Sequence, residues 1–573
     1  MKNTCFFLVL VMASLAVLSC SQKKEIVDPI DAYFKLVRPE FKGDVAFNTT
    51  AFVEQFWRVA GNTGFNKTVY KIVEELETAG FVEESKASIE ETLTYRIEKR
   101  VMQRPTWEPV DARLSIQGEE IPLLEYKTNR NMIYQYASST PAEGVTAEIV
   151  YVENVDDIDE LDLKGKIVYT NANPYRFYKS AIVHGGALGL ITYNNPDYLQ
   201  PEKNITSIQF RGVPYNKEIP VWGIALSYQA KERLEKALAK GKVTVNAFVK
   251  TNIYPSEELT VVANVKGSEL PKESLVFSAH IQEPGANDNA TGVGTQLEMA
   301  LITANLIKNK KLNLTRTLTF LWGDEIISTR RYIEEKEKRT SAINWGISLD
   351  MVGENTAITG GTFLIEKMPD PSAIWTRGND KHSEWGGKPL KLEEMKPHYL
   401  NDFIIKVFED QGKHANWEVK TNPFEGGSDH TPFLDADLPG ILLWHFTDQF
   451  YHTDNDRIDK VSKKTMTNVG IAALVSAYTL LNSDDTTKNW MIEEIIEKAK
   501  GRLTIEFDLS KEAIANGATK ESQIEILNAW NDWYIKAIAT TKDMTATSYT
   551  NNNSKKEAQE EIKMFTENLL KQL

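Results

Sequence analysis

Ionisable residues follow three apolar segments of the chain, each at the point where we expect a β-strand to end. His280 follows the first segment, Asp324 and Glu325 follow the second, and Asp350 follows the third. In open α/β sheets, ligands collect at the carboxyl ends of the strands, because loops and helix N-termini converge there. The pattern therefore predicts that these side chains share one pocket, although they lie tens of residues apart in the sequence.

Two further segments supply another carboxylate and a second imidazole. Residues 285–293 read Gly-Ala-Asn-Asp-Asn-Ala-Thr-Gly-Val, a tight loop from which the carboxylate of Asp288 can project. Residues 451–456 read Tyr-His-Thr-Asp-Asn-Asp and contain His452. Two histidines and three carboxylates suit zinc, and since one catalytic zinc normally takes fewer protein ligands, a carboxylate that bridges two ions accounts for the number. We therefore predict a site for two zinc ions, with His280, Asp288, Glu325, Asp350 and His452 as ligands.

The order of these segments is more specific than any one of them. It runs His, then Gly-Ala-x-Asp-Asn-x-x-Gly-Val, an acidic pair, an aspartate after a strand, and Tyr-His-Thr. Gln-Leu-Glu-Met-Ala at 296–300 and Gly-Ser-Asp-His-Thr-Pro-Phe at 427–433 belong to the same pattern. The whole, over about residues 45–484, resembles the co-catalytic zinc exopeptidase family of aminopeptidase Y, bacterial leucyl aminopeptidases, glutamate carboxypeptidase and glutaminyl cyclase. The resemblance implies hydrolysis of peptide bonds, by an aminopeptidase or a dipeptidase.

The same resemblance implies how the ligands divide between the two ions. His280 and Asp350 would hold one zinc ion, Glu325 and His452 would hold the other, and Asp288 would bridge both.

It also implies a general base and residues that support the site. Asp324, the first residue of the acidic pair, would take a proton from a water that bridges the ions and would later deliver it to the leaving amine. Residues expected behind the ligands or against the substrate are Gln282, Asp429, His430 and Tyr451.

Two positions depart from the family pattern. The family normally has glutamate where this chain has Asp324, and the shorter side chain loses about 1.5 Å of reach toward a proton that must lie within roughly 3.2 Å. The family commonly has an acid two residues after the first histidine, where this chain has Gln282. Glutamine can accept a hydrogen bond from the His280 ring but adds no charge, so the ring should be a less basic ligand. Both changes affect the expected rate more than metal binding.

Two other functions stay open. The main alternative is a catalytically weakened or inactive binding homologue on the same fold, as in the transferrin receptor, with Asp324 and Gln282 as its signs. Cyclisation of N-terminal glutamine by a single-zinc enzyme is the other, although such enzymes do not usually carry an inserted domain.

The elements that must position these residues follow an alternating pattern of strands and helices. Strands are expected at 275–279, 317–322, 345–349 and 440–444, with a helical face between the first two. This alternation predicts an α/β fold, and the resemblance makes it a three-layer α/β/α peptidase domain with a mixed sheet. Its main part is expected at 253–485 and its N-terminal part at 28–140.

Two segments lie outside this domain. Residues 141–252 resemble the β-rich protease-associated domain, through Leu-x-Gly-Lys-Ile-Val at 163–168, a Gly-Ala-x-Gly-x-Ile turn at 186–191 and Ile-Pro-Val at 219–221. Such inserted domains are thought to screen or position substrates. Residues 486–573 are expected to form a helical C-terminal extension.

The N-terminus reads as an export signal. A short positive region precedes an apolar run at 6–18, which has the length of a signal-peptide core and is too short for a comfortable membrane span. Val-Leu-Ser-Cys at 17–20 resembles a bacterial lipobox, so we expect residues 1–20 to be a lipoprotein signal and Cys20 to carry the lipid; an ordinary secretory signal is the alternative. The protein would then be a cell-envelope lipoprotein on the periplasmic or the surface face of the outer membrane.

The charge and the apolar segments of the chain limit the kinds of binding partner that we expect. The formal net charge of −14 argues against nucleic acid as a partner, and no later segment is apolar and long enough to cross a bilayer. The expected partners are peptide substrates, with membrane contact only through the N-terminal lipid. Cys5, the only other cysteine, lies within the signal, so the mature chain would contain no disulfide.

Overall fold

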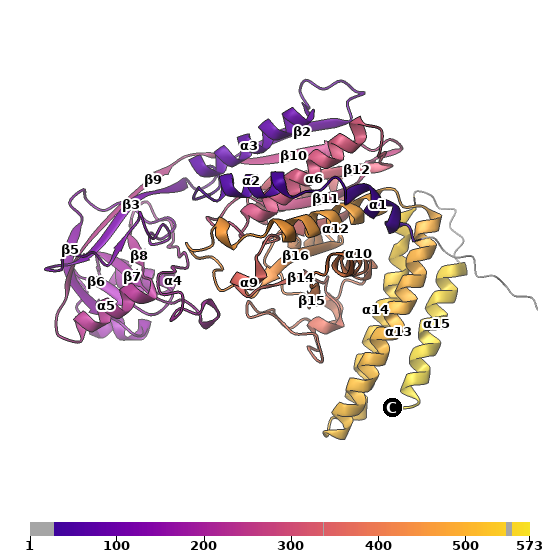
Figure 1. Ribbon diagram of the computed structural model, residues 1–573. Coiled ribbons are helices and arrows are strands. Elements are labelled where there is room, and N and C mark those ends of the chain that lie inside the picture. Colours follow the sequence, from indigo (N-terminus) through magenta and orange to yellow (C-terminus); the bar gives the residue numbers. More distant parts are fainter. Residues whose placement is uncertain (1–27, 336, 546–552) are drawn as a thin grey trace, which may run out of the picture.

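Two β-sheets organise the chain, and three long helices follow them at the C-terminus (Figure 1). The computed structural model describes residues 28–335, 337–545 and 553–573. The predicted signal peptide and the predicted lipidation site at Cys20 lie outside these residues. Within them, no helix is both long enough and apolar enough to span a membrane.

The larger sheet has nine strands in the order β1-β2-β10-β12-β11-β13-β16-β14-β15. Its centre is parallel, because β11 pairs with β12 and β13, and β13 pairs with β16. Antiparallel β10 and β14 flank this centre, so the sheet is mixed, as predicted. The strands are Val82–Glu83 (β1), Leu93–Val101 (β2), Glu257–Val265 (β10), Leu270–His280 (β11), Arg316–Gly323 (β12), Ile343–Leu349 (β13), Thr362–Glu366 (β14), Lys420–Asn422 (β15) and Gly440–Phe446 (β16).

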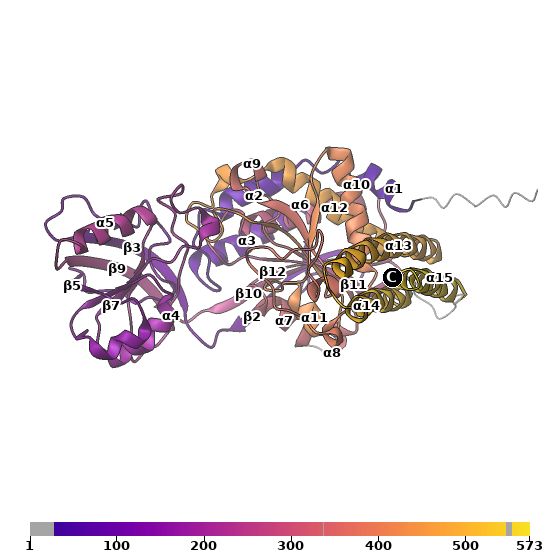
Figure 2. The same ribbon diagram turned by 90° about the horizontal axis from the view of Figure 1, so that it is seen from below.

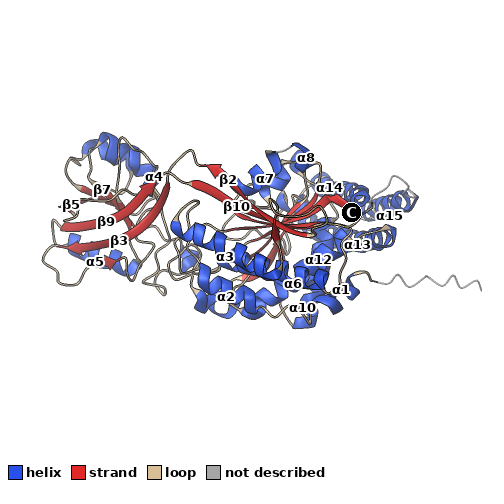
Figure 3. Cartoon of the chain, turned by 90° about the horizontal axis from the view of Figure 1, so that it is seen from above, coloured by secondary structure: helices blue, strands red, loops and turns tan. Residues whose placement is uncertain are grey.

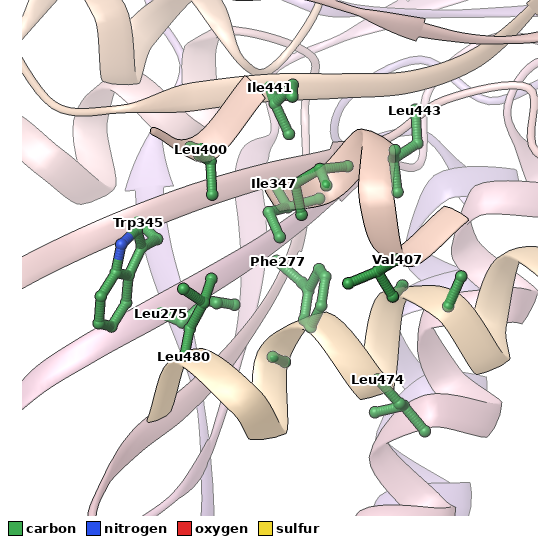
Figure 4. Packing of buried hydrophobic residues seen from close by; sticks show 14 of the residues in the cluster. Leu275, Phe277, Trp345, Ile347, Leu400, Val407, Ile441, Leu443, Leu474 and Leu480 are labelled. Carbon is green, nitrogen blue, oxygen red and sulfur yellow. The ribbon is translucent and has the colours of Figure 1, made fainter. Parts of the chain in front are cut away.

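Helices cover both faces of this sheet. On β11, Leu275 and Phe277 point into the larger core, which also contains residues of α6 (Ala290–Lys308), α10 (Leu400–Ala415) and α12 (Lys463–Leu481) (Figure 4). Val276, between them, faces the opposite side and packs with residues of α7 (Ile327–Glu334) and α11 (Thr431–Asp435). Because successive side chains of a strand point to opposite faces, this alternation gives three layers.

The smaller sheet has seven strands in the order β4-β3-β9-β5-β6-β7-β8, and it lies at one end of the molecule (Figures 1 and 2). It begins with β3, upstream of the boundary predicted at residue 141, although the division into domains itself stays a prediction. Its strand β3 has eleven residues, and β2 of the larger sheet, which precedes it in the chain, has nine. The strands are Thr106–Ile116 (β3), Leu124–Glu125 (β4), Val145–Tyr151 (β5), Ile167–Thr170 (β6), Gly189–Thr192 (β7), Gly223–Ala225 (β8) and Thr244–Tyr254 (β9).

The smaller sheet is inserted into a hairpin of the larger one. β2 and β10 are antiparallel neighbours, and Val101 at the end of β2 pairs with Glu257 at the start of β10. The chain between them runs through β3 and returns through β9, which are themselves antiparallel partners (Figure 3). The insertion therefore leaves the register of the larger sheet unbroken.

The remaining helices lie around the larger sheet or follow it. The C-terminal helices α13, α14 and α15 pack against one another, and α13 also contacts α10. The helical C-terminus agrees with the prediction. The helices not yet given are Ile30–Val37 (α1), Asp44–Val53 (α2), Thr63–Ala79 (α3), Pro174–Phe177 (α4), Tyr228–Leu238 (α5), Glu337–Thr340 (α8), Thr356–Thr359 (α9), Asp485–Ala515 (α13), Lys520–Thr540 (α14) and Asn553–Leu570 (α15).

Glu298, a buried residue of α6, fixes the start of α2. Its carboxylate accepts backbone N–H groups from Lys42 at 3.1 Å, Gly43 at 2.7 Å and Ala46 at 2.7 Å. The first N–H groups of a helix have no partner within the helix, so an external carboxylate satisfies them and also interacts favourably with the helix dipole.

Removal of this carboxylate should destabilise the fold. In Glu298→Ala the backbone N–H groups lose their acceptor, and we expect the free energy of unfolding to fall by about 3 kcal/mol. Urea denaturation followed by circular dichroism measures the change. Glu74→Ala is the matched control, because the Glu74 side chain is 69% exposed and its loss should change the free energy of unfolding by less than about 0.5 kcal/mol. Equal stability of the two variants would contradict the capping role of Glu298.

Candidate metal centre

The parallel strands end at one edge of the larger sheet and bring the predicted residues together there. His280 is the last residue of β11, and its register partner on β12 is Gly323, directly before Asp324 and Glu325. Asp350 directly follows β13, the other neighbour of β11. Adjacent strands with a common direction therefore place these side chains at one site, as the sequence predicted.

One group of three possible metal ligands consists of His280, Glu325 and Asp350. His280 Nε2 lies 3.3 Å from Asp350 Oδ1 and 4.0 Å from Glu325 Oε1. The other oxygen of Asp350, Oδ2, accepts a hydrogen bond of 2.7 Å from Ser428 Oγ. The hydroxyl group thus orients the carboxylate toward the histidine.

A second group consists of Glu283, Asp288 and His452. His452 Nε2 lies 3.1 Å from Glu283 Oε2 and 3.0 Å from Asp288 Oδ2. The opposite oxygen of Asp288, Oδ1, lies 3.6 Å from His280 Nε2 of the first group. Asp288 therefore stands between the two groups, with one oxygen toward each, which is the arrangement of a carboxylate that bridges two ions.

These spacings fit zinc. Ligand atoms placed tetrahedrally at roughly 2.0–2.1 Å from a zinc ion lie about 3.3 Å from one another, close to the 3.0–3.6 Å found here for four of the five contacts between the histidines and the carboxylates. His280 Nε2, Asp350 Oδ1 and Glu283 Oε2 are buried and form no hydrogen bond of good geometry with any described residue. Buried polar atoms normally have a partner, so these three atoms fit the role of metal ligands.

The groups differ from the division of ligands that the resemblance implies. Glu325 was expected beside His452, but the structure groups it with His280 and Asp350, and Glu283 occupies the position next to His452. Glu283 was not among the predicted site residues. An acid so close to the first histidine was the available signal, and it was missed because the family pattern directs attention to the preceding position, Gln282.

Gln282 contacts a different partner from the one expected. Its side chain does not accept a hydrogen bond from the His280 ring; instead Oε1 accepts the backbone N–H of Glu325 at 2.7 Å and Nε2 donates to Glu325 Oε2 at 3.0 Å. The Nδ1 atom of His280 lies 3.4 Å from the backbone carbonyl oxygen of Gln282. The amide group is neutral and has both a donor and an acceptor, so it can hold both ends of Glu325, which a carboxylate could not do.

Asp324 lies beside the two groups without belonging to either. Burial raises the pKa of its carboxyl group to about 7, while the nearby charges of Arg104 and His280 oppose this shift. Its backbone N–H donates to Ser328 Oγ at 2.8 Å, which fixes the turn at the start of α7. The carboxyl group lines a cavity of about 510 Å³ next to the ligands.

The other predicted residues take separate positions. Asp429 is buried and accepts the backbone N–H of Ile326 at 2.6 Å, so it holds the turn directly after Glu325; burial raises the pKa of its carboxyl group. The Tyr451 ring stacks on the His452 ring, with 3.7 Å between centroids. His430 is instead paired with Glu366, at 2.9 Å, and belongs to neither group of ligands.

Asp456 holds the Asp288 loop and was not predicted. Its two carboxylate oxygens accept the backbone N–H groups of Asn287 at 2.9 Å and Asp288 at 3.0 Å. A Cβ atom at Gly285 would lie 2.1 Å from Asp456 Oδ2, so glycine is required for this close approach. Burial raises the pKa of Asp456 to about 7, against the lowering effect of these hydrogen bonds.

The inserted sheet region contacts the second histidine. The backbone N–H of Phe210 donates to the carbonyl oxygen of His452 at 3.0 Å, and the two rings lie 4.5 Å apart. Next to them, Gln209 and Thr453 form an isolated antiparallel bridge, and Ile208 N donates to Asp454 Oδ1 at 2.8 Å. The inserted region therefore helps to position a metal ligand of the larger sheet.

Residues of both parts also line the cavity beside Asp324. Trp57, Tyr136 and Phe210 supply aromatic surface, and Glu283 and Glu325 border it at the metal groups. The cavity thus offers an apolar wall next to the ligands, with room for a side chain of a small substrate.

Comparison with known proteins finds similarity to a peptidase family over the segment that carries this geometry. Residues 260–477 match the sequence model of a family described as Peptidase family M28. Aminopeptidase YwaD of Bacillus subtilis (strain 168) is 25% identical over 381 residues, which cover 63% of this chain and 73% of YwaD. The probable lipoprotein aminopeptidase LpqL of Mycobacterium tuberculosis is 22% identical over 463 residues, which cover 74% of this chain and 80% of LpqL. The solved structure of a Peptidase M28 precursor from Shewanella amazonensis SB2B covers 80% of this chain and 97% of its own, with a TM-score of 0.53 at 16% identity, and shows the fold alone.

The segment that matches the family is also the segment that carries both groups of ligands. All six residues of the two groups lie within it, and their spacing and buried atoms fit zinc on grounds independent of the match. The chain is therefore a zinc metallopeptidase, and its residues 260–477 are similar to peptidase family M28.

Proposed function

We propose that this chain is a di-zinc aminopeptidase that hydrolyses peptides outside the cytoplasm. The observation that carries the proposal is Asp288, whose two oxygens face the two groups of ligands, with Asp324 at the adjoining cavity. When bound, two zinc ions supply a water of lowered pKa and polarise a peptide carbonyl group. The five predicted ligands, His280, Asp288, Glu325, Asp350 and His452, would hold them.

Asp324 is the proposed general base. Its carboxyl group lies next to the ligands but is not one of them, so its oxygens stay free to accept a proton at the reacting centre and to pass it to the leaving amine. Burial raises the pKa of this carboxyl group toward neutral pH, the range in which a carboxyl group can do both. The turn that carries it is fixed through Ser328 and Asp429.

The relatives support release of amino-terminal residues. Both YwaD and LpqL are described as aminopeptidases. The aromatic walls of the cavity, Trp57, Tyr136 and Phe210, suit an apolar side chain of the substrate residue that lies at the metal centre.

Export and lipidation are also proposed. The apolar run, the lipobox-like ending at Cys20 and the description of LpqL as a probable lipoprotein support a cell-envelope lipoprotein. Residues 141–252 are proposed to be the protease-associated domain, and their contact with His452 supports a role in positioning the site.

A binding homologue without useful turnover is the second candidate. The observation that favours it is aspartate at position 324, where the family normally has glutamate. All metal ligands implied by the resemblance are present, which favours the aminopeptidase.

For the proposed function, the first prediction concerns zinc and turnover. The purified protein should contain about two zinc ions per chain and should cleave amino-acid p-nitroanilides or dipeptides; removal of zinc by a chelator should abolish cleavage, and added zinc should restore it. Metal analysis and a substrate panel on the same sample measure this. A protein that holds two zinc ions but cleaves nothing in the panel is the result that would overturn the proposed activity.

The second prediction concerns the base. Asp324→Asn should lower kcat by roughly 10²–10⁴-fold, because proton transfer is lost, while the zinc content stays at the wild-type value. A kcat within tenfold of the wild type would exclude Asp324 as the base.

Asp324→Glu separates the two candidates. If the site is a weakened one, the longer side chain should raise kcat severalfold or more with unchanged zinc content. If the local geometry is built for aspartate, kcat should stay the same or fall, and we expect this second result because Ser328 and Asp429 fix the turn around Asp324.

A further inference from the structure

We infer that Glu283 is a metal ligand, which together with Asp288 and His452 holds the second zinc ion. The inference rests on the zinc chemistry of the proposed function and adds a residue that the family pattern does not assign. It concerns metal affinity, so it can be tested without any substrate.

The geometry places Glu283 where a ligand is needed. Its Oε2 atom lies 3.1 Å from His452 Nε2, almost the same distance as that between Asp288 Oδ2 and His452 Nε2, 3.0 Å. The ligand atoms of all three residues lie within 4.8 Å of one another. Glu283 Oε2 is also a buried atom without a well-formed hydrogen bond to any described residue, so a cation would satisfy it.

Glu325, the residue that the resemblance assigns to this ion, is engaged elsewhere. Its Oε1 atom lies 4.0 Å from His280 Nε2, and its Oε2 atom accepts a hydrogen bond of 3.0 Å from Gln282. Without Glu283, the described residues would offer the ion at His452 only His452 and Asp288 as nearby protein ligands. A catalytic zinc usually has three, and Glu283 supplies the third.

The backbone of Glu283 is held in a conformation that serves this position. Its φ angle is +82°, in the left-handed region that is strained for a residue with a Cβ atom. Arg58 enforces it from three directions: its carbonyl oxygen accepts Glu283 N at 2.8 Å, and its guanidinium donates to Ile281 O at 2.7 Å and to Gly285 O at 2.8 Å. Strain of this kind persists only where the surroundings over-determine it, and it concentrates at functional sites.

The summed charge of the two zinc ions and their ligands also supports Glu283 as a ligand. Asp288, Glu325 and Asp350 carry three negative charges, so two zinc ions with these ligands alone leave a buried centre with net charge +1. Glu283 brings the centre to zero. A buried charge without a partner is costly, so the fourth carboxylate should tighten zinc binding. The family commonly has an acid at the position of Gln282. In this chain Glu283 supplies that negative charge instead, although it contacts His452 and not His280.

Zinc titrations on the full exported chain test the inference. In competition with a chelating indicator, the wild type should bind two zinc ions. Glu283→Gln should bind one ion with unchanged affinity and the second at least about 100-fold more weakly. Loss of a residue that only supports a metal ligand already lowers metal affinity about 10–100-fold, so loss of a ligand should cost at least as much. Asp324→Asn is the matched control: it removes a neighbouring carboxylate that lines the cavity, and it should keep both zinc affinities. Wild-type affinities for both ions in Glu283→Gln would overturn the inference. If KM for peptides rises at the same time, the carboxylate of Glu283 binds the substrate and not the metal.

Glu283→Asp keeps the test decisive if the glutamine variant does not fold. This variant retains the charge but withdraws the oxygen by about one methylene, so the second ion should bind more weakly and the visible spectrum of the Co²⁺-loaded protein should change, because that ion loses a ligand. Unchanged affinity and an unchanged Co²⁺ spectrum would overturn the inference. Two tightly bound ions that depend on Glu283 in a protein that cleaves no peptide would instead leave the inference standing and reject the aminopeptidase.

Discussion

Four carboxylates that gather around two histidines set the main physical constraint on this structure. Asp288, Glu325 and Asp350 surround His280, and Glu283 and Asp288 face His452. Burial raises the pKa of Asp288 and, much more strongly, that of Glu325, because charged carboxylates in a dry site repel one another and lose their hydration. Cations bound between them reverse both effects. Zinc binding is therefore coupled to the stability of this edge of the sheet, since the ions bind the folded arrangement and not the separated residues of an unfolded chain.

Neutral donors hold two of these carboxylates in place, and a third is positioned through its backbone. Gln282 holds Glu325, Ser428 holds Asp350, and the backbone N–H of Asp288 is held by Asp456. Arg58 contributes differently: its guanidinium is completely buried, bonds only to carbonyl oxygens in the described structure, and has its pKa lowered to about 9 by that burial. Because no carboxylate is paired with it in the described structure, Arg58 adds positive charge near the site. It also fixes the strained loop at Glu283.

The sequence predicts the site well where the pattern depends on parallel strands. His280, Asp324, Glu325 and Asp350 follow apolar segments, and strands of common direction must end at the same edge, so their meeting follows from the alternation of strands and helices alone. Glu283 could not be found in this way. Its position depends on a left-handed backbone angle enforced by Arg58, which lies more than two hundred residues earlier in the chain. The lengths of β2 and β3 depend on distant residues in a similar way, because each strand pairs along its length with a partner far away in the sequence, β10 and β9 respectively.

The insertion of the smaller sheet explains how one site can depend on two parts of the chain. β2 and β10 form an antiparallel pair whose connection is the inserted region, and loop-closure cost grows only with the logarithm of loop length, so a long folded insertion is tolerated where a short turn would serve. The ribbon of β3 and β9 carries this region away from the larger sheet, yet its segment 208–210 returns to bond with residues 452–454. His452 lies on a loop after β16, has a positive φ angle of 60°, and lacks the support of a strand end that positions His280. The contacts from Phe210 and Ile208 supply that support. The inserted region is thus part of the metal centre's scaffold as well as a wall of its cavity, so a shift of this region relative to the larger sheet would move a metal ligand and the cavity wall together.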